Sequence, residues 1–568
     1  MVQIYCYPIG SKRHIQISMA KLFLGLDSST QSLSAVVIDL DTRKVIHEKS
    51  LNFDQALPQY GTRNGVLPNA DPLVKRSSPL MWAEALDRLF AEMKKDGVAL
   101  GQILAISGSG QQHGSVYLND HAAEALAKLD PQKPLVENLR LSRRSDLPRR
   151  NRAKTGTKAD GIFSRPTSPI WMDSSTAVEC AEIRKKLGGI KATAEATGSD
   201  TFERFTGPQI RKFYKTEPEA YARTASIALV SSFMASLLAG KIAPIDYGDG
   251  AGMNLMDIRK KVWHTGALAA TAPDLKLKLP PLAESWKVVG AVSPYFVKKF
   301  GLNPEAQTLV WSGDNPCSVV GLGLIREGMV AISLGTSDTY FGSMKKCRTD
   351  EHGEGHVFGS PTGDYMTLIC FKNGSLAREK IRDAYGIKDW EKFGEALKAA
   401  PPGNNGGILL PWFEAEIVPR VNRPGIHRFD LDEKDAAANC RAIVEAQMMS
   451  MRLHSQWMKV SPDRIFATGG ASQTSPILQI MADVMNCRVE RIEVSKSAAL
   501  GAALRAAHGW LVQTGKKPKW EKVVAGFTDP VPNSEIRPNP KATKVYDQLI
   551  EKYAACERTA LDQLCGKR

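Results

Sequence analysis

The sequence predicts an α/β protein built from two similar lobes with a ligand cleft between them. Its 568 residues are enough for two to four domains at about 100–200 residues each. One pattern occurs twice, over 22–37 and 330–341: a strand, a glycine, small hydroxyl residues with an aspartate, and a second strand. Helical periodicity follows the strands in both halves, which is typical of alternating strands and helices.

The composition is that of a folded protein without a membrane segment. Hydrophobic residues make up 43% and charged residues 24%, which excludes a mostly disordered chain. The 9 cysteines are scattered and form no CxxC pair, which favours reduced thiols in the cytoplasm. No apolar run approaches the roughly 18–20 residues that span a bilayer, and 1–20 lacks the features of a signal peptide. We therefore expect a cytoplasmic protein with no membrane partner and an N-terminal extension over 1–20.

The chain has an excess of positive charge, with 75 Lys and Arg against 60 Asp and Glu, a net of +15. The charge is densest over 140–158, inside an insert of about 130–165. This stretch has no aromatic residues to stack bases and no known nucleic-acid-binding motif. A solvated basic loop is the favoured interpretation, and nucleic-acid binding is the alternative.

The elements of the first half follow from local patterns. Residues 22–26 form an apolar strand that stops at Asp27, and alternating strands continue to residue 53. A strand then enters the glycine-rich turn at 108–114, and PIDYGDGAGMN, at 244–254, reads as a glycine-punctuated loop. Helices are predicted over 79–95, 174–187 and 227–238.

The second half is predicted to begin near residue 259 and to repeat this plan. Its parts are the strand and turn LVWSGDN, the hairpin at 330–341, helices, and the stretch RIFATGGASQ, in which a strand leads to a helix. The stretch from Pro540 is predicted to be helical. Two lobes that each offer a hydroxyl-rich hairpin suggest a nucleotide held between them.

Familiar phosphate-binding motifs are missing from the sequence. GxxxxGK[ST] does not occur, and the turn at 108–114 has His113 where a dinucleotide fingerprint needs its third glycine. The two hairpin turns are the alternative, because successive backbone N–H groups and hydroxyls form a nest for phosphate oxygens. Each turn alone is more often an ordinary hairpin, but two of them favour a phosphate site. Asp27 would hold Mg²⁺ there, directly or through water.

Other polar residues suggest a nucleoside site and a hydroxyl-bearing substrate. Paired glycines at 469–470 let a flat ring approach the backbone, although a plain strand-to-helix turn is the simpler interpretation. Asp246 could take a hydroxyl proton, the alternative being an Asp-Gly turn. His113 and the pair Asp314-Asn315 could bind polyol hydroxyls or be structural. Asp173 and Arg204 add polar groups without independent weight.

Ten ordered motifs make the sequence resemble the FGGY carbohydrate kinases, most closely the xylulose kinases of animal and plant type. They are GLDSSTQS, SGSGQQHGSVY, PIWMDSST, ERFTGPQI, LVSSFMASLL, PIDYGDGAGMNL, SGDNPCSVVG, ISLGTSDT, CFKNGSLAREKIRD and ATGGASQ. The resemblance covers about 21–510 and implies two actin-like, ribonuclease-H-like lobes, 21–258 and 259–568, hinged near residue 258. These lobes close over ATP, Mg²⁺ and a sugar.

The resemblance also implies roles for individual residues. Asp246 matches the catalytic base and Asp27 the metal and phosphate acid. The positions that match sugar contacts are His113, Arg204, Asp314 and Asn315, and Gln112 and Asp173 are further candidates for sugar binding. The positions that match nucleotide contacts are Trp390, Gly469, Gly470 and Gln473. The candidates for phosphate binding in the two hairpin turns are Ser28, Ser29, Thr30, Gly335, Thr336 and Ser337.

The implied reaction is transfer of the ATP γ-phosphate to a ketose, D-xylulose giving D-xylulose 5-phosphate. Ribulose, fuculose and glycerol are alternative substrates of the family, and a non-catalytic ATP-gated actin-like protein is the alternative from another class. The sequence departs from the family pattern in its long basic insert and at Gly248 and Gly250, where relatives often carry serine. The expected assembly is a monomer or a homodimer.

Overall fold

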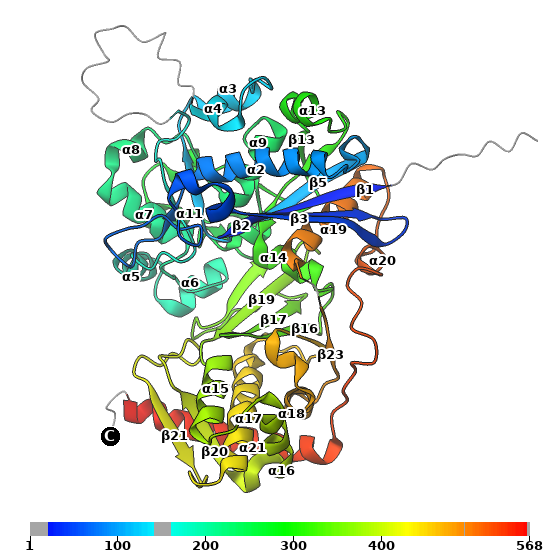
Figure 1. The fold of residues 1–568 in the computed structure, drawn as a ribbon. Helices are drawn as coiled ribbons and strands as arrows, with labels where there is room; N and C mark the ends of the chain where they lie inside the picture. Colours follow the sequence, from blue (N-terminus) through cyan, green and yellow to red (C-terminus); the bar gives the residue numbers. More distant parts are fainter. Residues whose placement is uncertain (1–20, 141–160, 494, 565–568) are drawn as a thin grey trace, which may run out of the picture.

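The computed structural model describes residues 21–140, 161–493 and 495–564. Figure 1 shows an elongated molecule of two α/β lobes, each built around one sheet, with β1 in the upper lobe and β16 in the lower. The predicted fold class is therefore confirmed. The N-terminal extension and most of the basic insert lie outside the described residues.

The first sheet has the strand order β13-β14-β5-β1-β2-β3, and β15 also pairs with β5. β1 runs parallel to β5 and antiparallel to β2, so that Asp27 lies opposite Ser109 on one side and Ser34 on the other. The strands are β1 (Leu22–Ser28), β2 (Ser32–Asp39), β3 (Lys44–Asn52), β5 (Ile103–Gly110), β13 (Val288–Ala291), β14 (Gln307–Leu309) and β15 (Ser312–Gly313).

The second sheet repeats this plan in the order β18-β19-β17-β16-β22-β23. β16 is antiparallel to β17 and parallel to β22, as β1 is to β2 and β5, which confirms the predicted duplication. The strands are β16 (Met329–Leu334), β17 (Asp338–Met344), β18 (His356–Gly359), β19 (Tyr365–Phe371), β22 (Arg464–Thr468) and β23 (Val489–Arg491).

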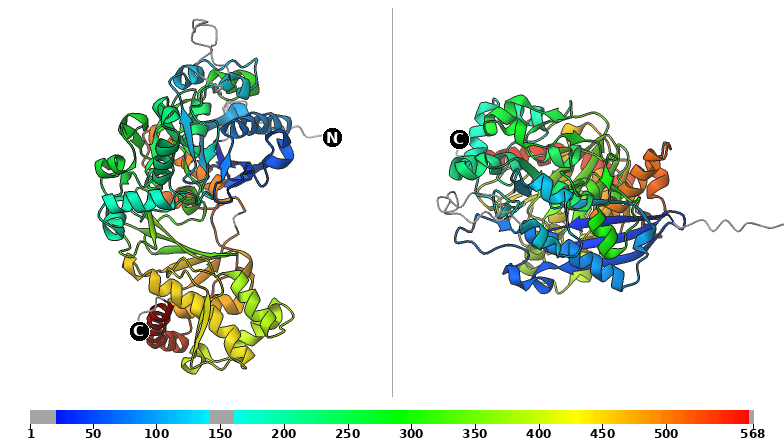
Figure 2. Two further views of the ribbon diagram at one scale, coloured as in Figure 1. Left: turned by 90° about the vertical axis from the view of Figure 1, so that its left-hand side faces the viewer. Right: turned by 90° about the horizontal axis from the view of Figure 1, so that it is seen from above.

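The expected division at residue 258 does not match the sheets. β13, β14 and β15 follow residue 258 in the chain but belong to the first sheet, because β14 and β15 pair in parallel with β5. The chain also returns to the first lobe through α19 (Ser497–Gln513). A Cβ on Gly25 would lie 2.0 Å from the carbonyl oxygen of Ala499, so glycine lets β1 lie directly against this helix. Figure 2 shows the orange α19 within the upper lobe.

The helices agree with the periodicity where an apolar face is long. The predicted helix over 79–95 is α2 (Pro79–Lys95), and the C-terminal helix is α21 (Pro540–Leu564). The other helices used below are α4 (Leu135–Arg140), α5 (Ala177–Lys186), α7 (Thr206–Thr216), α9 (Val230–Ala239), α10 (Tyr247–Ala251), α13 (Pro294–Phe300), α14 (Asp314–Gly321), α15 (Ser375–Ala384), α16 (Trp390–Ala399), α17 (Ala436–His454) and α18 (Ser475–Met485).

Two short segments differ from the prediction. The predicted helix over 227–238 begins as the strand β8 (Ser226–Leu229), which pairs with β6 (Ser115–Leu118), before α9 starts. The predicted loop at 244–254 contains the strand β9 (Ile245–Asp246) and the helix α10. Asp246 caps α10 by accepting a hydrogen bond from the backbone N–H of Asp249, which offsets the low helix propensity of the glycines.

Candidate active site

Four carboxylates gather near the ends of β1, β9 and β15 in the first lobe: Asp27, Asp246, Asp249 and Asp314. β1, β5 and β15 are parallel, so their carboxyl ends meet at one edge of the sheet, where ligands bind in open α/β sheets. Asp246 and Asp249 are buried, whereas Asp27 and Asp314 are half-buried. The fold thus joins residues that lie far apart in the sequence.

Asp246 is the most firmly held of these carboxylates. Its Oδ1 accepts hydrogen bonds from Ser312 Oγ at 2.5 Å and from the backbone N–H of Asp249 at 2.9 Å. Its Oδ2 lies 3.7 Å from Nη2 of Arg505 on α19. Burial raises the pKa of Asp246, while the Arg505 charge and the hydrogen bonds lower it. These contacts fix a carboxylate that can accept a proton.

Two further carboxyl groups of the cluster, Asp249 and Asp314, have raised pKa values. Asp249 accepts a hydrogen bond from Ser231 Oγ, and its other oxygen is buried without a protein partner. Burial and then the charges of Asp246 and Asp314 raise the pKa of Asp249 well above its ordinary value. Burial also raises the pKa of Asp314 to about 6.

The first hairpin turn has the shape that its sequence predicts. Asp27 accepts a hydrogen bond from Ser109 Oγ at 2.7 Å, and burial followed by the charge of Asp314 raises its pKa to about 7. Ser29 closes the turn by donating from N and from Oγ to the carbonyl of Ser32, each at 3.0 Å. Ser28 Oγ is buried without a protein partner, and Thr30 Oγ1 accepts a hydrogen bond from Trp171 Nε1.

The residues predicted to bind sugar form a connected network beside the carboxylates. The backbone N–H of Gln112 donates to Asp314 Oδ1 at 3.3 Å, and its side-chain oxygen accepts from Asn315 Nδ2 at 2.9 Å. His113 Nδ1 lies 2.8 Å from the carbonyl oxygen of Gly252, and the His113 ring packs on Phe205 with centroids 4.4 Å apart. Burial and then the Arg204 charge lower the pKa of His113 to about 3.

Arg204 connects this network to the second lobe. Its Nη2 lies 3.3 Å from Nε2 of His356 on β18, so the guanidinium donates to a neutral imidazole. Burial and the neighbouring Arg204 charge lower the pKa of His356 well below its ordinary value. Phe202 and Phe205 pack against both side chains. The predicted sugar-binding arginine is thus held at the contact between the lobes.

The two glycines that depart from the family pattern lie in close contacts. A Cβ on Gly248 would lie 2.8 Å from the carbonyl oxygen of Gly359, which is part of β18 in the second lobe. A Cβ on Gly250 would lie 2.7 Å from a methyl group of Leu282. Glycine at both positions therefore lets α10 pack tightly against its neighbours.

Asp173 is held by hydrogen bonds from the protein itself. Its Oδ2 accepts a hydrogen bond from the backbone N–H of Lys75, and its Oδ1 accepts from Ser175 N, Ser175 Oγ and Gln209 Nε2. Asp173 is also buried, so these four protein donors hold two loops to α7 through its carboxylate. Its contact with a sugar stays a prediction.

The residues predicted to hold the nucleotide lie at one edge of the second sheet. Thr336 and Ser337, at the turn after β16, are exposed, as are Gly469, Gly470 and Gln473 after β22. β16 and β22 are neighbours, so the two turns lie together. Gly469 has φ +86°, and a Cβ there would lie 2.5 Å from the Leu334 carbonyl oxygen, so this turn requires glycine. Gln473 lies in a short 3-10 turn, and α18 begins only at Ser475.

Trp390 lies on the same side of the second lobe. Gly394 of α16, one turn beyond it, would place a Cβ 3.5 Å from Pro476 at the start of α18. The Arg382 guanidinium lies over the Trp390 ring at 4.7 Å, a cation–π contact. Helix α16 is thereby held against the segment that follows the glycine turn.

The two hairpins differ in the place of their aspartate. Asp27 is the next-to-last residue of β1, the first strand of its hairpin, and belongs to the carboxylate cluster, whereas Asp338 begins the second strand of the other hairpin. Asp338 is fully buried and forms two hydrogen bonds with Arg378 of α15, at 2.7 and 3.1 Å. It is therefore a structural residue, and the predicted likeness of the hairpins extends only to the backbone and hydroxyls.

Sequence reasoning missed several polar residues of this site. The groups that hold or face the predicted residues include Ser231, Ser312, Arg505 and His356. Ser231 and Ser312 stand in the motifs LVSSFMASLL and SGDNPCSVVG, but we assigned them no role, and Arg505 and His356 lie outside the quoted motifs. One signal was available for Arg505, since it is a lone charged residue in the apolar stretch SAALGAALRAA. A single arginine on such a helix needs a buried partner.

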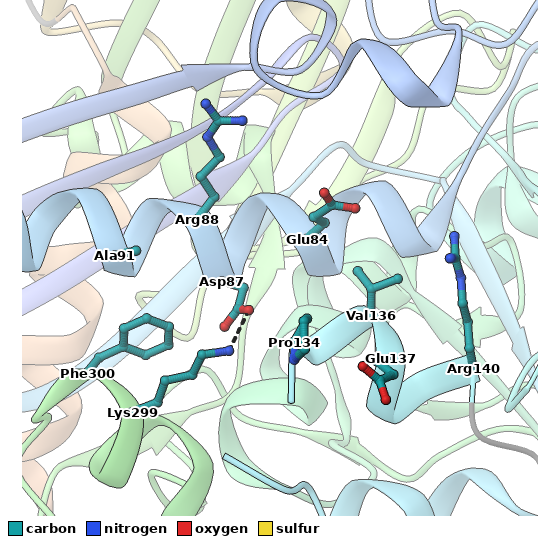
Figure 3. Close-up of a pocket in the computed structure, with 10 residues that line it drawn as sticks. All are labelled: Glu84, Asp87, Arg88, Ala91, Pro134, Val136, Glu137, Arg140, Lys299 and Phe300. Carbon is teal, nitrogen blue, oxygen red and sulfur yellow. Dashed lines mark hydrogen bonds and ion pairs between the residues drawn. The ribbon is translucent and has the colours of Figure 1, made fainter. Parts of the chain in front are cut away.

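Figure 3 shows a different pocket, on the outer face of the first lobe between α2, α4 and α13. Its volume is about 480 Å³. Lys299 and Asp87, which line it, are already paired at 2.8 Å, and the Tyr295 hydroxyl donates to the same carboxylate. None of the four clustered carboxylates, Asp27, Asp246, Asp249 and Asp314, is among the residues that line this pocket, so it is not the active-site candidate.

Because His113 is buried and neutral, we expect it to make the free energy of unfolding depend on pH. Because the pKa of His113 falls to about 3 on folding, the unfolded chain binds more protons between pH 3 and about 6.5, and stability is lost as the pH falls through this range. As the pH falls through this range, we expect the free energy of unfolding of His113→Gln to decrease less steeply than that of the parent. The two slopes should differ by up to about 1.4 kcal/mol per pH unit. Exposed His121→Gln serves as the control in melting curves from pH 7.5 to 4.5, and equal slopes for all three proteins would contradict the expectation.

The two lobes contain sheets of the same plan. One sheet has carboxylates at its edge, and the other has hydroxyl groups and glycines. These features are typical of two-lobed phosphotransferases. Models of the N-terminal and C-terminal domains of the FGGY family of carbohydrate kinases match residues 167–321 and 330–510. The chain belongs to this family, and it is an ATP-dependent carbohydrate kinase.

Individual relatives extend the similarity over nearly the whole chain. A xylulose kinase of Rattus norvegicus is 42% identical over 553 residues, covering 96% of this chain and 98% of that protein. Xylulose kinase 2 of Arabidopsis thaliana is 42% identical over 511 residues, covering 86% and 87%. The crystal structure of a xylulose kinase from Rhodospirillum rubrum superposes with a TM-score of 0.78 at 20% identity, covering 96% and 100%, and shows the shared fold. In the described residues, no helix is long and apolar enough to cross a membrane.

Proposed function

We propose that this enzyme transfers the γ-phosphate of ATP to D-xylulose and forms D-xylulose 5-phosphate. The observation that carries the proposal is the 42% identity to the rat xylulose kinase over 96% of this chain. The site geometry supports it, since a fixed buried carboxylate stands beside amide and imidazole groups suited to several hydroxyls.

In the proposed mechanism the first lobe holds the sugar and takes its proton. Asp246 accepts the proton of the attacking hydroxyl, and Ser312 and the Asp249 N–H hold its carboxylate in place. His113, Arg204, Asp314 and Asn315 bind the ketose, and Gln112 keeps Asp314 and Asn315 in register. Closure of the lobes would exclude water and limit ATP hydrolysis.

The hairpin turns and the glycine turn are proposed to bind ATP. Ser28, Ser29 and Thr30 would meet the phosphates from the first lobe, and Gly335, Thr336 and Ser337 from the second. Gly469, Gly470, Gln473 and Trp390 would surround the nucleoside.

Mg²⁺ fits beside Asp27, because the Asp27 carboxylate is close enough to Asp314 for the charge of Asp314 to raise its pKa, and carboxylate oxygens are ligands of Mg²⁺. When bound there, the ion would neutralise phosphate charge. Because the seven described cysteines carry free thiols, we also propose a reducing compartment such as the cytoplasm.

A panel of sugars tests the proposed substrate. ADP release is measured with D-xylulose, ribulose, fuculose, gluconate and glycerol at matched concentrations, and kcat/KM is compared. We expect D-xylulose to give the highest value. A higher value for another sugar would replace the substrate but keep the reaction, and ATP turnover that no sugar stimulates would overturn both.

Replacing His113 by alanine is expected to raise the KM for xylulose more than the KM for ATP. The His113 ring belongs to the proposed sugar network in the first lobe, whereas the proposed nucleoside contacts lie in the second. Both KM values come from initial rates in the ADP-release assay. Equal increases in the two KM values would show that His113 is only structural.

A further inference from the structure

Arg505 is a fully buried arginine on α19, and the mechanism above leaves it without a role. Its guanidinium donates to the backbone carbonyls of Gly108 at 3.2 Å and Val310 at 3.0 Å, which belong to the first sheet and its edge. Further bonds reach Ser285 Oγ and O, and Cys317 Sγ. All of these acceptors are neutral, so they fix the guanidinium without balancing its charge.

The negative group closest to the Arg505 guanidinium belongs to the carboxylate cluster. Within the described residues, the carboxylate that lies within 4 Å of it is Asp246, at 3.7 Å. The titratable groups facing Asp246 are Asp249 and Tyr247 of α10, Cys317 of α14 and Arg505 itself. Cys317 keeps its proton, since burial raises its pKa to about 12, and Asp249 is a carboxyl group that supplies no positive charge. Arg505 is therefore the cation that opposes the effect of burial at Asp246, beside the hydrogen bonds from Ser312 and the backbone.

We propose that Arg505 is a positioning residue whose fixed charge keeps the Asp246 carboxylate ionised, so that it can accept the proton of the sugar hydroxyl. This inference rests on the proposed function, in which Asp246 is the base. An uncharged side chain at position 505 would leave Asp246 buried beside Asp249 with no cation, and the carboxylate would hold a proton at neutral pH. A protonated carboxyl cannot act as the base.

The test is the pH dependence of kcat/KM for xylulose at saturating ATP and Mg²⁺. In Arg505→Met the acid limb is expected to move up by at least about one pH unit, because an opposite charge within about 4 Å typically lowers a carboxyl pKa by 1–3. The activity lost at neutral pH should return as the pH is raised. Arg441→Met is the matched control, because Arg441 is also buried but lies in the second lobe, bonded to Glu445 and Tyr546. Its acid limb should match that of the parent even if its stability falls.

An acid limb in folded Arg505→Met equal to that of the parent would overturn the proposal. If that variant does not fold, Arg505→Gln and Arg505→Lys are compared, since both keep hydrogen-bond donors and differ in charge. The limb of the Gln variant must then lie above that of the Lys variant, and equal limbs would overturn the proposal. Asp246→Asn separates the two claims: normal turnover in that variant refutes Asp246 as the base, whatever Arg505 does.

Discussion

Replacing Asp246 by asparagine is expected to lower kcat by about 10²–10⁴-fold and to leave sugar binding largely intact. The amide keeps the shape of the side chain and can still accept from Ser312 and from the N–H of Asp249, so the cap of α10 and the local fold should survive. It cannot accept the hydroxyl proton. kcat is measured by ADP release, and the Kd of xylulose by calorimetry in the absence of ATP.

The control for Asp246→Asn is Asp96→Asn, at the exposed end of α2, which should keep the parent kcat. A kcat within a few-fold of the parent in Asp246→Asn would refute Asp246 as the base. Loss of xylulose binding together with kcat would instead show that Asp246 holds the sugar, and the proton would then need another acceptor.

The sequence predicted the backbone plan because that plan depends on local patterns. Alternating and apolar runs located β1, β2, β16 and β17, and the apolar face of residues 79–95 gave the bounds of α2. The division at residue 258 failed for a non-local reason. Whether β14 and β15 join the first sheet depends on pairing with β5, about 200 residues earlier in the chain. Local sequence patterns do not indicate which distant strand a segment pairs with.

The candidate site was predicted where residue types are unusual and missed where they are common. Motifs containing His113, Asp246 and the pair Asp314-Asn315 marked most of the polar network. Serine is frequent in turns and helices, so even their places in LVSSFMASLL and SGDNPCSVVG did not show that Ser231 and Ser312 hold carboxylates. The same ambiguity applies to Asp173, because a motif position does not tell whether a carboxylate faces a ligand or donors of the protein.

Replacing Arg378 by methionine is expected to lower the free energy of unfolding by about 3–5 kcal/mol. Arg378 and Asp338 are both essentially unexposed, and the guanidinium contacts both carboxylate oxygens. Methionine fills the space but leaves the Asp338 charge buried without a cation. The measurement is the shift in the urea midpoint of the second lobe. The control is Arg326→Met, which breaks an exposed pair with Asp463 and should cost about 0–1 kcal/mol.

The double variant Arg378→Met/Asp338→Asn shows whether charge or packing sets that loss. If the unpaired carboxylate is the main cost, removing its charge should restore much of the stability, and the double variant should be more stable than Arg378→Met alone. If the two losses simply add, the bond from Arg378 to Gln447 and the packing of α15 carry the stability instead. In that case the buried charge of Asp338 would not be the reason that an arginine is needed at position 378.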